Sequence, residues 1–195
     1  MWKAISWVKE KSNIKIILAL TALFIVFLVF MNGNIIGTAK LKSVTGGAGI
    51  LDLEFGYSAD RAYNILESQG TEGRQLYKVM LYVDFAFPFV YMMFGVLTIG
   101  YLLKINKIKN NAVHYLIFVP VLAMFCDWTE NILILQMIGK FPAKMAVIAL
   151  LSSTFTIMKF IFIAIFFAAI VVFFVRTIFS SKRKSINIKT RENIK

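Results

Sequence analysis

Residues 114–138 read HYLIFVPVLAMFCDWTENILILQMI, and this stretch decides the fold class. It is long enough to cross a bilayer, because a helical span needs about 20 mainly apolar residues. Similar apolar runs lie at 14–34, 76–103 and 145–178, and most lysines fall between them. A soluble domain would mix the two kinds of residue along the chain. We therefore predict an all-α protein, a four-transmembrane-helix bundle that forms a single integral membrane domain over residues 1–195.

The distribution of basic residues predicts the topology. The segment before the first span, the loop between spans two and three, and the basic tail at 180–195 all carry an excess of lysine or arginine. The loop between spans one and two balances Lys40, Lys42, Arg61, Arg74 and Lys78 with Asp52, Glu54, Asp60, Glu67 and Glu72. Short cytoplasmic segments are enriched in basic residues. We expect both termini in the cytoplasm (N-in/C-in) and the first loop outside.

The formal net charge of +12 does not indicate a nucleic-acid partner, because the excess flanks the spans. We expect the tail at 180–195 to interact with anionic lipids of the bilayer, at about 1 kcal/mol per charge near the surface. The single cysteine, Cys126, cannot form a disulfide within the chain and is expected to be a small core residue. The sequence predicts no oligomeric state.

The extracytoplasmic loop at 35–75 is expected to be partly helical. Ser58 has the character of a helix N-cap, and a short amphipathic helix is predicted over 59–69. Gly70 follows as a natural terminator. The loop is therefore predicted to cover the outer end of the bundle.

Four charged residues lie inside the predicted spans: Asp84, Asp127, Glu130 and Lys159. A charge at mid-membrane costs at least about 2.5–3.5 kcal/mol, so it persists when it is paired, hydrated or functional. Counting 1.5 Å of rise per residue from the inner boundary puts each of them roughly 20–30 Å up, in the outer half. Asn131 shares a helix face with Asp127 and Glu130. We predict a cluster of these residues, with Asp84 near its mouth, as a candidate ligand- or ion-binding site.

Two interpretations of this cluster remain open at this point. Polar side chains can join membrane helices by roughly 0.6–2 kcal/mol per contact without any further role. Three acids against one lysine, however, leave at least one carboxylate that must be protonated, hydrated or bound to a ligand cation.

Pro88 and Pro120 are candidate hinges or kinks, because proline removes a backbone hydrogen bond. Tyr91 and Trp128 are interpreted as lipid-facing or packing side chains.

The chain also resembles a known family over part of its length. The residues concerned are Gly56-Tyr57-Ser58 through Tyr77 with Gly70, Gly73 and Arg74, then Asp84…Phe87-Pro88, and later Asp127…Glu130-Asn131. They resemble a family of uncharacterised bacterial four-span membrane proteins. The resemblance implies a location in the bacterial cytoplasmic membrane, but no activity, cofactor or substrate.

Three functional hypotheses follow. The leading one is the binding or transport of a cation, proton or small amine or lipid through a polar cavity open to the outer side, with Asp127 and Glu130 taking up the cation. An alternative is an intramembrane enzyme that acts on a lipid or polyprenyl substrate by carboxylate acid/base chemistry. Another is an accessory subunit that docks a partner through the outer loop. The spans lack paired histidine ligands, so no metal or other cofactor is expected.

Overall fold

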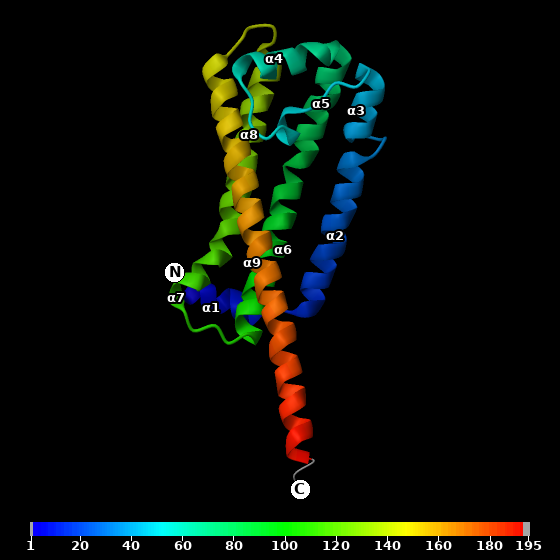
Figure 1. Ribbon diagram of the computed structural model, residues 1–195. Helices are drawn as coiled ribbons and strands as arrows, with labels where there is room; N and C mark the ends of the chain where they lie inside the picture. The colour runs from blue at the N-terminus through cyan, green and yellow to red at the C-terminus, as the bar shows by residue number, and fades with distance from the viewer. Residues whose placement is uncertain (1, 193–195) are drawn as a thin grey trace.

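The structure, a computed structural model, describes residues 2–192, with side chains up to Ser180, and every regular element in that range is a helix (Figure 1). Four helical segments are long and apolar enough to cross a membrane: Ile14–Asn32, Gly70–Ile105, Asn111–Lys140 and Ala146–Ser180. The all-α class and the four apolar helices are therefore confirmed. The elements are α1 (Trp2–Lys11), α2 (Ile14–Asn32), α3 (Thr38–Thr45), η1 (Leu51–Leu53), α4 (Ala59–Ser68), α5 (Gly70–Asp84), α6 (Ala86–Ile105), α7 (Asn111–His114), η2 (Tyr115–Phe118), α8 (Val119–Lys140) and α9 (Ala146–Glu192).

The long helices form a bundle in which α8 and α9 pack against each other and α6 packs against both. Helix α2 packs mainly on α6. It is the least buried of the four: 6% of the residues in its most apolar stretch are buried, against 67% for the α5–α6 segment. In Figure 1, α1 and the C-terminal part of α9 lie at one end of the bundle, and α3 and α4 lie at the other. We call these the terminal end and the loop end.

Two apolar cores lie along the bundle. The terminal core is built around Ile5, Val8, Val96, Ile99, Leu103, Ile117, Met124 and Phe166. The loop core is built around Leu41, Leu51, Leu66, Met80, Leu81, Ile134, Met137 and Ala149. Along α8, Met124 belongs to the terminal core and Ile134 to the loop core, so Asp127, Glu130 and Asn131 fall between the two.

The same alternation occurs on the other helices. On α5 and α6, Asp84 separates Leu81 of the loop core from Val96 of the terminal core. On α9, buried Ser152, Ser153, Thr156 and Lys159 separate Ala149 from Phe166. Because the three helices interrupt their apolar faces at matching heights, a band of polar side chains crosses the bundle. We call this band the polar layer: Asp84, Asp127, Glu130, Asn131, Ser152, Ser153, Thr156 and Lys159.

The loop between α2 and α5 folds over the loop end of the bundle (Figure 1). Helix α4 is capped by Ser58, whose side chain accepts a hydrogen bond from the backbone of Arg61. Gly70 separates α4 from α5 with a φ of 62°, a left-handed conformation that favours glycine. Helix α5 begins there, so the second span is already helical several residues before the predicted start at 76. The loop also contains α3 and η1, which the sequence did not predict.

The two prolines predicted as hinges or kinks, Pro88 and Pro120, lie where the helices change direction or type. Pro88 follows the break between α5 and α6 at Phe85. Pro120 lies in the first turn of α8, directly after the 3-10 helix η2. A Cβ on Gly95 would lie 2.7 Å from the ring of Pro120, so only glycine lets α6 approach α8 this closely. The structure therefore gives Pro120 a packing contact as well as a position at a helix junction.

Helix α9 continues beyond its apolar stretch to Glu192. The side chains of residues 181–195 lie outside the described part of the structure. The interaction of the basic tail with anionic lipids therefore stays a prediction.

Candidate functional site

The centre of the polar layer is an ion pair between α8 and α9. Lys159 Nζ lies 2.6 Å from Glu130 Oε2 and 3.5 Å from Asp127 Oδ1. All three side chains are at most 7% exposed. Asp127 and Glu130 are one helical turn apart, so both carboxylates face α9 and meet the same ammonium group. The structure thus brings together three residues that the sequence placed at similar depths.

Glu130 is enclosed on every side. Its other carboxylate oxygen, Oε1, accepts a hydrogen bond of 2.6 Å from the hydroxyl of Thr156. Its relative exposure is 0%, and it does not line the cavity described below. A buried charge is tolerated when it is paired and hydrogen-bonded. Glu130 is therefore the structural partner of Lys159 and has no free face for a ligand.

Asp127 is held differently. Its Oδ2 accepts a hydrogen bond of 3.0 Å from the hydroxyl of Tyr91 on α6. Its Oδ1 has only the ion-pair approach of Lys159 and no hydrogen bond among the described residues. Tyr91 packs in the terminal core, as one of its two interpretations expected, and its hydroxyl also orients this carboxylate, which the sequence did not predict. Trp128 also has a polar contact, since its Nε1 donates to the carbonyl of Phe85 at the α5–α6 break.

Asp84 extends the polar layer toward α5. Its Oδ2 accepts a hydrogen bond of 2.9 Å from Asn131 Nδ2, and no described residue donates to its Oδ1. Asn131 is fully buried, and its own Oδ1 has no donor in the described part of the chain. Asp84 itself is 8% exposed and borders the cavity. The five candidate residues therefore form two contact groups, Asp84 with Asn131 and Lys159 with Asp127 and Glu130, and Asp84 and Asp127 line the same cavity.

The loop adds an acid that the sequence analysis counted only in the charge balance. Asp52 belongs to η1, and the hydroxyl of Tyr77 donates to its carboxylate. Lys159 Nζ also donates to the backbone carbonyl of Asp52, at 3.4 Å. One feature of the sequence could have indicated that this segment is not a solvated loop: Asp52 stands between two apolar residues, Leu51 and Leu53.

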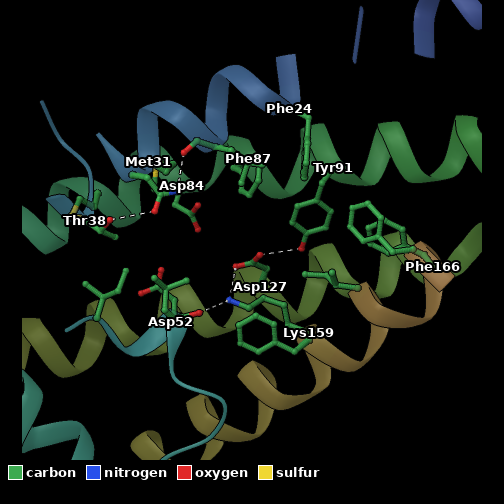
Figure 2. A pocket seen from close by; sticks show the side chains of 18 residues that line it. Phe24, Met31, Thr38, Asp52, Asp84, Phe87, Tyr91, Asp127, Lys159 and Phe166 are labelled. Atoms are coloured by element: carbon green, nitrogen blue, oxygen red, sulfur yellow. Dashed lines mark hydrogen bonds and ion pairs between the residues drawn. The ribbon is translucent and has the colours of Figure 1, made fainter. Parts of the chain in front are cut away.

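A cavity of about 250 Å³ adjoins these carboxylates. Figure 2 shows that Asp52, Asp84 and Asp127 direct their carboxylates toward this space, with Lys159 beside Asp127. The remaining walls are mostly apolar or aromatic and come from α2, α5, α6 and α9, with Thr38, Ile50 and Leu53 contributed by the loop. The lining includes Phe24, Leu28, Met31, Met80, Phe87, Tyr91, Phe160, Ile163, Phe166 and Phe167.

Tyr57 fastens the loop to α9 beside the polar layer. Its hydroxyl donates to Ser152 Oγ and its backbone N–H donates to Ser153 Oγ, both at 2.7 Å. Burial raises the pKa of Tyr57 to about 12, with smaller opposing effects from its hydrogen bonds. The hydroxyl therefore keeps its proton and remains a donor at neutral pH. This anchor holds η1, and with it Asp52, over the cavity.

The formal charges of the cavity lining, three aspartates against one lysine among the described residues, do not balance. The charged residues that line the cavity are Asp52, Asp84, Asp127 and Lys159, and Lys159 is already shared with Glu130. Among the described residues, no group of three or more His, Cys, Asp or Glu side chains is arranged to hold a metal ion.

Comparison with protein-family models, with curated proteins and with solved structures finds no match for this chain.

Proposed function

We propose that the protein binds a ligand cation, an amine in its protonated form, in the cavity of the polar layer, as a membrane-embedded binding or transport protein. The observation that carries this proposal is a pair of cavity-lining carboxylates with spare acceptor capacity. Asp84 Oδ1 accepts no hydrogen bond from described residues, and Asp127 Oδ1 has only the 3.5 Å ion pair with Lys159. Among the described residues, Lys159 is the one basic side chain of the lining.

An ammonium group suits this arrangement for two reasons. It has three N–H donors, which suit the spare acceptor capacity of Asp84 and Asp127, and its attraction to carboxylates is strong where water is scarce. The aromatic rings in the cavity wall, such as Phe87 and Phe160, add favourable cation–π contacts. A metal ion would need several oxygen ligands around it, whereas most of these walls are carbon.

The supporting residues give the site a fixed geometry. Tyr91 orients Asp127, Asn131 orients Asp84, and Tyr77 orients Asp52. Such preorganisation lowers the entropic cost of binding. Lys159 keeps the empty site from carrying the full negative charge of its acids, and Glu130 keeps Lys159 in place. A bound ammonium would then neutralise the charge that Lys159 leaves uncompensated.

The proposal includes an orientation in the bacterial cytoplasmic membrane, with both termini inside. The unopposed lysines at the terminal end support it, because basic residues favour the cytoplasmic side. Ser43 and Asn110 are both exposed and lie on opposite sides in this topology. We expect Ser43→Cys to react with a membrane-impermeant maleimide in intact cells, and Asn110→Cys to react only after permeabilisation. The reverse pattern would contradict the proposed orientation.

The binding proposal is tested by calorimetric titration of the purified protein in nanodiscs with hexylammonium and, as a neutral control, hexanol. We expect saturable binding of the amine alone, weakened at least tenfold in Asp127→Asn and in Asp84→Asn. Asp60→Asn, which alters an exposed loop acid, serves as the matched control and should bind like the wild type. Equal binding of amine and alcohol, or unchanged affinity in both cavity variants, would overturn the proposal.

A further inference from the structure

The cavity has two apolar walls that face each other across its side. Helix α2 contributes Phe24, Leu28 and Met31 to one wall, and α9 contributes residues such as Ile163 and Phe167 to the other. These residues lie in the membrane-spanning parts of both helices. The charged groups of the lining are Asp84 of α5, Asp127 of α8, Asp52 of η1 and Lys159, which lies one turn before Ile163 on α9 (Figure 2). The cavity is therefore amphipathic, with an acidic inner side and an apolar side toward the bilayer.

The two helices that form the apolar walls are not packed together along their length. Helix α2 packs on α6, and its contact with α9 is minor. Phe24 lies with its ring centroid 6.4 Å from that of Phe167 and 5.3 Å from that of Phe87, which closes the cavity toward the terminal end. On the loop side of this aromatic floor, Leu28 remains 40% exposed and Ile163 is half-buried. The cavity therefore reaches the lipid-facing surface between α2 and α9.

The loop covers the cavity from the other direction. Asp52 and Leu53 of η1 form part of its wall, and Tyr57 holds this segment against α9. The exposed side chains near this cover are apolar: Leu53 is 63% exposed and Phe55 is 70% exposed, with the Phe55 ring 5.9 Å from that of Phe160. An apolar rim of this kind suits contact with lipid at the membrane interface better than contact with water.

We propose that the ligand is an amine with an apolar chain, and that it reaches the acids sideways from the bilayer, between α2 and α9. This inference rests on the proposed function and names its ligand class and route. The ammonium group lies between Asp84 and Asp127, and the chain leaves the cavity past Leu28 and Ile163 into the leaflet. A cavity of about 250 Å³ is small beside the roughly 300–1,000 Å³ typical of ligand pockets, so it holds the head group and only the first part of a chain.

The route can be tested by narrowing the opening. In phosphatidylcholine nanodiscs containing the full chain, we would measure binding of radiolabelled dodecylammonium and of methylammonium, which has no chain to place. Leu28→Trp and Ile163→Trp each add bulk at the opening and leave every carboxylate of the cavity in the chain. Val29→Trp is the matched control, because Val29 is 69% exposed and borders a different surface of α2. Thermal unfolding of each variant shows whether it is folded.

We expect the wild type to bind dodecylammonium at least tenfold more tightly than methylammonium. Leu28→Trp and Ile163→Trp should weaken or slow the binding of the long-chain amine at least tenfold and affect methylammonium far less, and Val29→Trp should behave like the wild type. Equal affinities for the two amines, or wild-type binding by both opening variants, would overturn the inference while leaving the proposed function standing. Failure of every amine to bind the wild type would overturn the proposed function itself.

Discussion

The terminal core and the polar layer are neighbouring parts of one bundle that share α8 and α9, yet they are held together in different ways. In the terminal core, buried apolar side chains such as Ile99 and Phe166 only pack. In the polar layer, buried side chains have specific partners on another helix or on the loop, as Glu130 has in Lys159 and Ser152 has in Tyr57. A carboxylate oxygen without a donor, such as Asp84 Oδ1, is therefore unusual in the polar layer, and packing does not explain it.

The largest expected effect on stability comes from removing Lys159, the cation that Glu130 and Asp127 share. Lys159→Met keeps the volume of the side chain but leaves Glu130 and Asp127 without their buried partner. Removing one member of a buried ion pair typically costs about 3–5 kcal/mol. We expect a fall in the free energy of unfolding of that order, measured by denaturation in mild detergent. Lys104→Met, at an exposed lysine of α6, is the control and should change stability by less than about 0.5 kcal/mol.

The second effect concerns the terminal core. Ile99 is fully buried and does not line the cavity, so Ile99→Ala should cost about 2–4 kcal/mol through the space it leaves. Unlike the changes in the polar layer, it should leave hexylammonium affinity at the wild-type value when measured well below the unfolding temperature. A large loss of affinity would mean that the two regions are not separate in function, and the comparison would break down.

A smaller effect is expected from Tyr91, which borders both regions. Tyr91→Phe keeps the ring but removes the hydroxyl that donates to Asp127. The loss of one hydrogen bond to a charged group costs about 1.5–3 kcal/mol, and part of this is recovered if water replaces the donor. We expect amine affinity to fall severalfold because Asp127 is less firmly oriented, measured by the same titration. Tyr82→Phe, at an exposed tyrosine of α5, should have no effect.

The smallest effect concerns the attachment of the loop. Tyr57→Phe removes the hydrogen bond to Ser152 but keeps the backbone bond to Ser153, so we expect a loss of only about 1 kcal/mol. The result should be faster proteolysis within residues 46–56, with little change in global unfolding. A loop that is cleaved no faster than in the wild type would show that other contacts of the loop core suffice to hold η1 in place.

Much of the fold and part of the site could be predicted from the sequence. The spans follow from the length of the apolar runs, and the meeting of Asp127, Glu130 and Lys159 follows from the fixed rise of a helix and the spacing of residues on one face. The position of Asp52 could not be derived in this way, because no periodicity governs the irregular chain around η1. Nor could the hydroxyl of Tyr91, since an aromatic residue in a span fits a packing role equally well.

The different surroundings of the two acids of α8 also needed the structure. Asp127 and Glu130 share a helix face and were expected to serve the ligand together, but Glu130 is enclosed by Thr156 and Lys159 whereas Asp127 lines the cavity. A difference of one helical turn decided which carboxylate reaches open space. Spacing gives the face of a helix, but only the packing of its neighbours decides which part of that face remains free.

The most direct test of the polar layer is a double-mutant cycle between Glu130 and Lys159, with unfolding followed for the wild type, Glu130→Gln, Lys159→Met and the double variant. Removing either partner leaves the other buried and uncompensated. The double variant should therefore lose less free energy of unfolding than the two single variants lose together, and we expect a difference of about 2 kcal/mol or more. Single effects that add to within about 0.5 kcal/mol would contradict a layer in which the charges of α8 and α9 depend on each other.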